Sequence, residues 1–238
     1  MPTCFPAHGL IGLIGLLRPA LLGTACAALA ACDDAAPVAQ LPGLTLMSAQ
    51  DVDPASMPGG EDALRRVHYR DRHGEGVLVL ERSDSLADDA GRGGTLDTAI
   101  LTARLYIRPG PSTAWTKQWQ RQIRQPCAGP VLEARWLLQH VSATDLDGDG
   151  QAEITLASRT FCGGENDPHQ LHVSLIDGTT RYGIAGETRL DAAGGVHAAG
   201  QRHPSPSLAT APPVFVEYLD TVWTTLLNSA ALHAREAH

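Results

Sequence analysis

The sequence lacks the short motifs that mark common catalytic and nucleotide-binding sites. It contains no G-x-S-x-G, no H-E-x-x-H, no P-loop and no dinucleotide-binding glycine fingerprint. Positive charge is also scarce, because 18 Lys and Arg stand against 26 Asp and Glu and give a formal net charge of −8. An acidic body argues against DNA or RNA as a partner, since their binding depends on neutralising phosphates. These absences favour a protein that is not an enzyme and that binds no nucleic acid.

The N-terminal apolar segment is too short for a membrane-spanning helix. Such a helix needs about 20 apolar residues without a central charge, and Arg18 and Pro19 interrupt residues 10–31. Residues 20–31 have the length of the apolar part of a signal peptide. They end in Leu-Ala-Ala-Cys at residues 29–32, which resembles a bacterial lipoprotein signal. The resemblance implies cleavage before Cys32 and lipidation of that cysteine, and two acyl chains anchor a protein firmly.

This N-terminus predicts a protein of the periplasm or cell envelope whose lipid anchor contacts a membrane. Residues 1–31 are interpreted as a signal peptide, and residues 32–60 as the lipidated cysteine and a flexible tether rich in Ala, Pro, Asp and Ser. An ordinary secretory signal cut near Ala31 and a retained transmembrane helix are the alternatives. Asp33 after the cysteine resembles an inner-membrane retention signal, but the choice between inner and outer membrane stays open.

The number of cysteines agrees with export. Of the five, Cys4 and Cys26 leave with the signal peptide and Cys32 carries lipid, which leaves Cys127 and Cys162. A remaining even pair in an oxidising compartment predicts a disulfide bond. Two reduced, buried thiols are the alternative, and no obvious base accompanies either residue as a catalytic cysteine would require.

Residues 61–238 are expected to form a single, mainly β (α+β) domain. Their short segments alternate apolar and polar residues between turn residues, and Asp177-Gly178 is a strong hairpin turn. Sequence-adjacent pairing predicts an antiparallel meander of about eight strands with one solvated face. The strand candidates are residues 67–69, 77–81, 99–108, 115–124, 134–144, 153–161, 171–177 and 180–184.

In the C-terminal part of the chain, the apolar residues are spaced differently from those of the predicted strands. Residues 192–213 are rich in Gly, Ala, Ser and Pro and predict a long loop. The apolar residues that follow are spaced as on one face of an amphipathic helix, which we expect to pack on the sheet. The residues of this face are Phe215, Leu219, Val222, Trp223 and Leu226.

The strongest chemical signal is the segment T-D-L-D-G-D-G-Q-A-E at residues 144–153. Carboxylates at loop positions 1, 3 and 5, a glycine at position 6, a carbonyl at position 7 and a carboxylate at position 9 make an all-oxygen shell. Hard oxygen ligands select Ca²⁺ over softer metals, and no ligand is left over as a base, so the ion's predicted role is structural. An acidic turn that holds no ion is the alternative. The predicted ligands are Asp145, Asp147, Asp149, Gln151 and Glu153.

The acidic loop and its surroundings resemble known sequences. A helical EF-hand needs Glu where Leu156 stands, so the loop instead resembles the hairpin loops of integrin-type and VCBS-like extracellular repeats. Residues 145–153, 161–168 and 180–186 together resemble an uncharacterised bacterial family described as surface polysaccharide biosynthesis protein. The resemblance covers roughly residues 67–190 and supplies no catalytic residues.

Together these features predict a lipid-anchored envelope protein with a structural Ca²⁺ loop. It is expected to be a non-enzymatic binding or accessory module linked to cell-surface polysaccharide, with an envelope protein or a glycan as its partner. The alternative is a periplasmic hydrolase acting on surface glycans, with residues 192–213 as a lid. That alternative requires two carboxylates facing each other in a deep pocket.

Overall fold

The computed structural model describes residues 44–47, 57–60, 62–88, 91, 94–164, 167–188, 190–192, 195–198 and 200–236, all within the unit that spans residues 39–238. The predicted signal peptide (residues 1–31) and Cys32 lie outside these residues. In the described ranges, no helix combines the length and apolar character that crossing a membrane requires.

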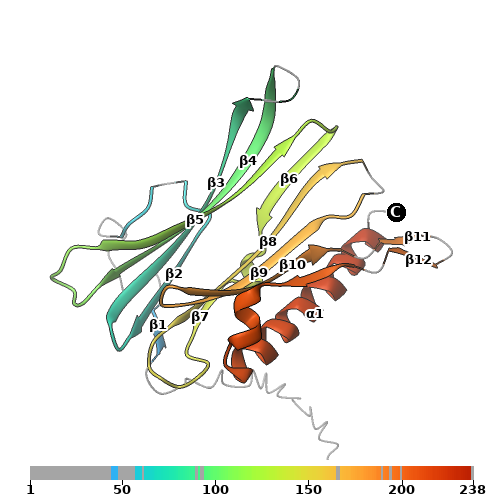
Figure 1. Cartoon of the computed structure of the whole chain (residues 1–238). Coiled ribbons are helices and arrows are strands. Elements are labelled where there is room, and N and C mark those ends of the chain that lie inside the picture. Colours follow the sequence, from blue (N-terminus) through green and yellow to red (C-terminus); the bar gives the residue numbers. More distant parts are fainter. Residues whose placement is uncertain are drawn as a thin grey trace, which may run out of the picture. The chain divides into compact units, whose positions relative to one another are not determined.

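The first sheet has five antiparallel strands in the order β1-β2-β3-β4-β5 (Figure 1). This order follows the sequence, as predicted for a meander. The turn between β2 and β3 ends at Gly74, whose φ of 120° favours glycine and whose Cβ, if present, would collide with the carbonyl of Arg108. The strands are β1 (Thr45–Leu46), β2 (Arg65–Asp71), β3 (Gly74–Asp88), β4 (Thr95–Arg108) and β5 (Thr116–Cys127).

The second sheet has six strands in the order β13-β10-β9-β8-β6, and β7 also pairs with β8. The hairpin predicted at Asp177-Gly178 is confirmed between β9 and β10, where Gly178 has a φ of 53°. The strands are β6 (Val131–Trp136), β7 (Ser142–Thr144), β8 (Glu153–Gly163), β9 (Gln170–Asp177), β10 (Thr180–Glu187) and β13 (Arg202–Pro204). The other elements are η3 (Leu138–His140), β11 (Leu190–Ala192), β12 (Gly195–Ala198), η4 (Pro206–Thr210) and α1 (Pro213–Glu236).

The two sheets pack face to face around one hydrophobic core. Alternation in β4 places Leu101 and Leu105 in this core, together with Ile154 and Leu156 of β8. Trp136 is also buried here, and its Nε1 donates a hydrogen bond across the interface to the carbonyl of Glu81, 3.1 Å away. The division of the strands into two sheets was not part of the sequence prediction.

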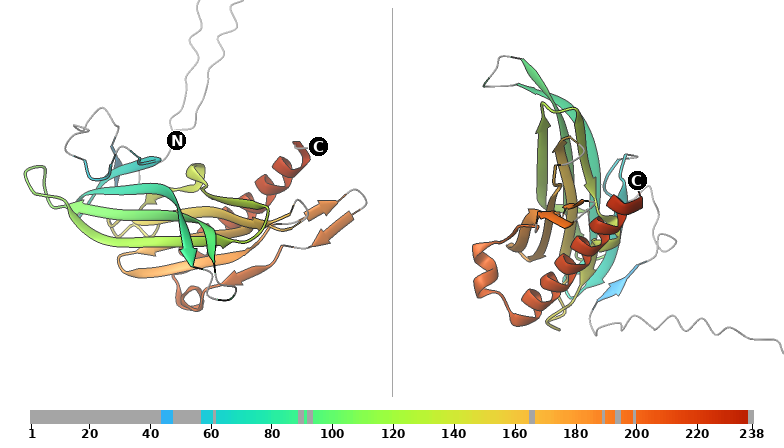
Figure 2. Two further views of the ribbon diagram at one scale, coloured as in Figure 1. Left: turned by 90° about the horizontal axis from the view of Figure 1, so that it is seen from above. Right: turned by 90° about the vertical axis from the view of Figure 1, so that its right-hand side faces the viewer.

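Helix α1 covers the opposite face of the second sheet (Figure 2). Phe215 and Leu219 are fully buried against Val173 of β9 and Ile184 of β10 in a second core. Burying one such side chain contributes about 1.5–3 kcal/mol. The prediction of a mainly β fold with a C-terminal amphipathic helix packed on the sheet is therefore confirmed, and the second sheet is the middle layer of three.

Two predicted segments differ from the structure. The candidate strand at residues 134–144 is divided by η3, because the chain must turn for β6 and β7 to pair with successive parts of β8. The loop predicted at residues 192–213 is wrong in both halves, because β12 pairs with β11 in the first half and two more elements form the second half. There, β13 pairs with the edge of β10, which supplies partners for its backbone, and η4 buries Leu208 in the second core.

Cys127 and Cys162 join the two sheets. The Sγ atoms of Cys127, at the end of β5, and Cys162, in β8, lie 2.11 Å apart, at bonding distance. The pair predicted from the cysteine count is thus brought together, and it links the edge strand of the first sheet to β8, an inner strand of the second.

Candidate metal centre

The acidic loop closes the hairpin between β7 and β8. Thr144 and Glu153 are paired at the ends of the two strands, so residues 145–152 form the loop itself. Gly148 and Gly150 have φ values of 76° and 82°, a left-handed conformation that other residues adopt only with strain. The glycines therefore allow the backbone to coil and turn its acidic side chains toward one point.

Four of the predicted ligands meet in this loop. One carboxylate oxygen from each lies within 4.8 Å of the others, so the cluster can hold a metal ion. Asp145 and Glu153 are buried at 0% and 1% exposure, whereas the other two are exposed. The centre therefore has a closed end inside the protein and an open end toward solvent. The clustered residues are Asp145, Asp147, Asp149 and Glu153.

Backbone amides orient these carboxylates. The Leu146 N–H donates to Glu153 Oε2 over 2.7 Å, and the Gly150 N–H donates to Asp145 Oδ2 over 3.1 Å. Asp145 Oδ1, by contrast, is buried and accepts no hydrogen bond from any described residue. A buried carboxylate oxygen without a partner is costly, and a cation bound at this point would supply the missing interaction.

The charge balance of the centre also favours a cation. Burial, and then the nearby carboxylates of Asp147 and Asp145, raise the pKa of Glu153 to about 8, although the N–H of Leu146 opposes the shift. Burial and the charge of Asp147 likewise raise the pKa of Asp177, at the end of β9. Burial is the larger cause of both shifts and the neighbouring carboxylates add to it, so uncompensated negative charge is unfavourable at this place in the fold.

The fifth predicted ligand, Gln151, lies beside the cluster. Its side-chain amide donates to Asp177 Oδ1 over 2.7 Å, and its backbone N–H donates to Asp149 Oδ1, also over 2.7 Å. These contacts fix residue 151 between the loop and β9. Ligation through its backbone carbonyl stays a prediction.

Sequence reasoning missed two residues that hold the loop from the other sheet. Asp71 Oδ2 accepts a hydrogen bond from the Ala152 N–H over 3.0 Å. The Arg72 guanidinium pairs with the Asp149 carboxylate over 3.2 Å, and its backbone N–H donates to the Gly150 carbonyl over 2.9 Å. The only signal for them was the tight turn that follows β2, since they lie almost 80 residues before the loop.

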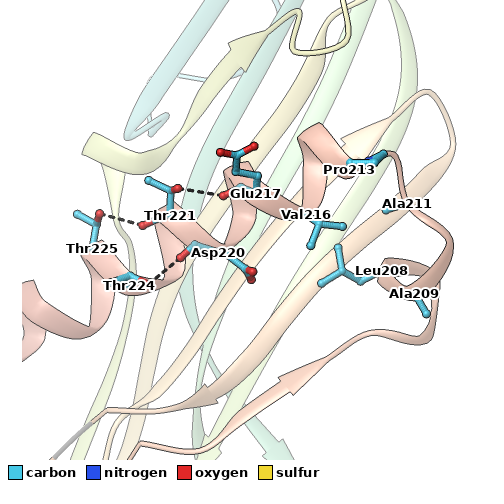
Figure 3. Close-up of a pocket in the computed structure, with 10 residues that line it drawn as sticks. All are labelled: Leu208, Ala209, Ala211, Pro213, Val216, Glu217, Asp220, Thr221, Thr224 and Thr225. Atoms are coloured by element: carbon cyan, nitrogen blue, oxygen red, sulfur yellow. Dashed lines mark hydrogen bonds between the residues drawn. The ribbon is translucent and has the colours of Figure 1, made fainter.

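A groove between η4 and α1 has fewer polar groups available to a ligand than the metal centre has (Figure 3). The hydroxyls of Thr221 and Thr224 donate to the carbonyls of Glu217 and Asp220, four residues earlier in the same helix. The carboxylate of Asp220 is paired with Arg202. The helix itself therefore uses these polar groups, and none of them points to a ligand.

Comparisons with known proteins add no relative. The chain matches no protein-family model, and no curated protein or solved structure shows significant similarity to it.

Proposed function

We propose that this protein is a lipid-anchored component of the bacterial cell envelope whose fold is stabilised by Ca²⁺. In this proposal it is a non-enzymatic binding or accessory module linked to cell-surface polysaccharide. The observation that carries the proposal is the buried Asp145 carboxylate, one oxygen of which has no partner among the described residues. One carboxylate oxygen of Asp145 lies within 4.8 Å of oxygens of Glu153 and of the two exposed aspartates, so an ion bound by Asp145 is within reach of all four residues.

The donor set supports Ca²⁺ as the ion. All four clustered side chains offer carboxylate oxygens, which hard cations prefer, and neither sulfur nor imidazole is among them. Ca²⁺ accepts irregular oxygen shells of six to eight ligands, whereas Mg²⁺ requires a nearly regular octahedron. Backbone carbonyls and water complete such a shell, and Gln151 is the expected carbonyl donor.

The position of the loop supports a structural role for the ion. Asp71 and Arg72 attach the loop to the first sheet, while β8 belongs to the second. Neutralising the carboxylates at this junction therefore stabilises the packing of one sheet on the other. A bound ion stabilises the folded protein by mass action, by about 2.7 kcal/mol at 100 times its Kd.

Three further features support the proposed location in the cell envelope and the proposed class of non-enzymatic protein. The Leu-Ala-Ala-Cys sequence at residues 29–32 resembles a lipoprotein signal, and the bonded pair Cys127–Cys162 suits an oxidising compartment. Common catalytic motifs are absent from the sequence. The link to polysaccharide rests on the resemblance of residues 145–153, 161–168 and 180–186 to the family described above.

The hydrolase alternative gains no support from the two cavities that lie between the described parts of the sheets. Among their lining residues the only carboxylate is Asp71, and it already accepts hydrogen bonds from the backbone N–H groups of His73 and Ala152. Paired carboxylates of the kind that cleave glycosidic bonds are therefore missing from these cavities.

Radiolabelled palmitate tests the anchor in the native bacterium. We expect label on the full-length protein, no label on the Cys32→Ala variant, and unchanged label on the Cys26→Ala variant as the matched control. An unlabelled wild-type protein confined to the cell interior would contradict the proposed location.

Deletion of the gene tests the link to polysaccharide. We expect the capsule or the lipopolysaccharide profile of the deletion strain to change, and we expect the wild-type gene supplied in trans to restore it. An unchanged profile would remove this part of the proposal and leave the anchor and the metal site intact.

A further inference from the structure

The two sheets leave a small cavity, lined by apolar and polar side chains, beside the edge strand β5. Strand β5 ends the first sheet, and the cavity lies where it crosses β8, β9 and β10 of the second. Its volume is about 80 Å³. Because one water takes up about 30 Å³ of liquid, the cavity accommodates a carboxylate or a phosphate group but not a sugar ring.

Two arginines face each other at this cavity. In β5, Arg121 is paired with Ala103 of β4, whose side chain is buried between the sheets, so Arg121 points toward the second sheet. In β10, Arg181 is paired with Ile176 of β9, which lies in the core between the sheets, so Arg181 points toward the first sheet. Both side chains line the cavity from opposite walls.

No acid neutralises these two charges. The lining of the cavity includes no carboxylate, and neither Arg121 nor Arg181 forms an ion pair with any residue that the structure describes. Burial and then the charge of Arg121 lower the pKa of Arg181, as expected when two guanidinium groups are close. Both residues are exposed, and the guanidinium of Arg121 also lies 6.0 Å from the centroid of the Trp119 ring, so solvent and an anionic ligand can both reach these charges.

A buried hydroxyl forms the floor of the same cavity. Ser158 of β8 is 1% exposed, and its Oγ has no hydrogen-bond partner among the described residues. His172 of β9 lines the cavity next to it, and burial followed by the charge of Arg181 lowers the pKa of this imidazole. An imidazole offers an N–H donor in either protonation state, so the cavity combines two cations with two further donors.

A larger cavity adjoins this one and shares Arg121. It has a volume of about 470 Å³, within the range of small-molecule sites. Its walls include the aromatic rings of Tyr69 and Trp119 and the polar side chain of Gln118. Trp119 Nε1 is buried and has no hydrogen-bond partner in the described part of the chain. This space therefore provides apolar ring faces and a second unused donor for the rest of a ligand.

We propose that the intersheet cleft, defined as these two cavities, binds an anionic sugar. Its carboxylate or phosphate lies between Arg121 and Arg181 and accepts a hydrogen bond from Ser158, while its ring occupies the larger cavity beside Trp119. The oxyanion site stands on the geometry alone. The choice of a sugar as the remainder of the ligand rests on the proposed function.

Calorimetric titration of the purified full-length protein in detergent tests the cleft. The probes are D-glucuronate, glucose 6-phosphate, inorganic phosphate and neutral glucose. We expect glucuronate or glucose 6-phosphate to bind at least tenfold more tightly than glucose, and the preferred probe identifies the oxyanion. Inorganic phosphate that binds as tightly as either sugar would overturn the assignment of the larger cavity, and failure of all three anions would overturn the whole inference.

Variants of single arginines test whether the anion binds in the cleft or to surface charge in general. Arg121→Gln and Arg181→Gln are each expected to weaken binding of the preferred anion at least tenfold. Arg124→Gln is the matched control, because alternation along β5 turns this exposed residue to the opposite face. An equal loss in the Arg124→Gln variant would contradict a specific site.

Ser158→Ala provides a second, independent readout. Removing an unpartnered buried hydroxyl is expected to leave the unliganded protein at least as stable, while anion binding weakens several-fold. Unchanged anion binding in this variant would exclude Ser158 from the site. These measurements are independent of palmitate labelling and of polysaccharide profiles, so the failure of this inference and the failure of the proposed function are distinguishable.

Discussion

The backbone N–H of Ala152 donates a hydrogen bond to Oδ2 of Asp71, 3.0 Å away, and so connects the acidic loop of one sheet to the end of β2 in the other. Arg72 adds two contacts to the same loop, through its backbone N–H to Gly150 and through its guanidinium to Asp149. An ion bound in the loop is therefore coupled to the packing of the two sheets as well as to the conformation of its own hairpin.

This coupling predicts the effect of Asp71→Ala. The substitution leaves the buried N–H of Ala152 without its acceptor, which costs about 1–3 kcal/mol. We expect urea denaturation to show a loss of stability of about this size. Calorimetry is expected to show Ca²⁺ affinity reduced several-fold, although Asp71 is not one of the clustered carboxylates.

Asp97→Ala is the control for this experiment, since Asp97 is an exposed carboxylate in β4. It is expected to change neither the stability nor the Ca²⁺ affinity by more than a small fraction of the Asp71→Ala effect. If Asp71→Ala leaves both quantities unchanged, the loop is not mechanically coupled to the first sheet.

The buried end of the metal centre predicts that Asp145→Asn abolishes stabilisation by Ca²⁺. Extracellular Ca²⁺ modules have Kd values of about 10⁻⁴–10⁻³ M, so about 10 mM CaCl₂ is expected to raise the Tm of the wild type by several degrees relative to EDTA. The amide retains the shape of the side chain but removes the charge that binds the ion. Thermal denaturation of the variant is expected to give the same Tm in both buffers.

Two controls test whether the rise in Tm depends on this site and on Ca²⁺. Asp84→Asn alters an exposed carboxylate that pairs with Arg82, and it is expected to retain the full Ca²⁺-dependent shift. MgCl₂ at the same concentration is expected to give a smaller shift, because four protein carboxylates crowd an ion that retains most of its own water. A wild type that responds to neither cation would contradict the metal site.

Local patterns predicted much of this fold. The alternating residues of β4, the Asp177-Gly178 turn and the apolar face of α1 each lie within a short stretch of sequence, and the strand, hairpin and helix that they predicted are confirmed. The four clustered carboxylates were predictable for the same reason, since their spacing lies within nine residues and needs only a coiled hairpin loop to bring them together.

Such local patterns could not predict contacts between residues that lie far apart in the sequence. Alternation shows that a strand has two different faces, but it does not show which sheet the strand joins, so the two-sheet arrangement and the contacts of Asp71 with Ala152 were missed. The structure shows strands covered on both faces as unbroken runs of buried residues, such as 98–103 in β4, 153–158 in β8 and 173–176 in β9. Arg121 and Arg181 likewise meet only through the crossing of β5 over β10.

A buried ion-pair network on the first sheet predicts a pH dependence. Glu75 is 3% exposed and accepts hydrogen bonds from Arg70 over 2.7 Å and from Arg108 over 2.6 Å. Burial alone would raise the pKa of Glu75, but the two guanidinium groups outweigh it and hold the pKa below its ordinary value. The network therefore contributes its full stability above the ordinary pKa and loses it as the pH falls through the lowered pKa.

Glu75→Gln is expected to remove this dependence. At neutral pH the variant loses about 3–5 kcal/mol, because the largely buried Arg108 has no counter-charge. As the pH falls below the ordinary pKa of a glutamate, about 4.3, its stability is expected to fall less steeply than that of the wild type, as measured by urea denaturation at a series of pH values. Glu217→Gln is the control, because it changes an exposed carboxylate of α1. If the stability of Glu75→Gln falls with pH as steeply as that of the wild type, Glu75 does not dominate acid unfolding.

The bonded pair Cys127–Cys162 predicts a large effect of reduction on stability. The two residues are 35 positions apart and belong to different sheets. Closing a loop of this length in the unfolded chain stabilises a protein by about 2–4 kcal/mol. The double variant Cys127→Ala/Cys162→Ala is therefore expected to unfold at a lower urea concentration than the wild type and to show no response to dithiothreitol. The urea midpoint of the reduced wild type is expected to approach that of the double variant. If mass spectrometry verifies that the pair is reduced and the urea midpoint does not change, the link adds nothing to the contacts between the sheets.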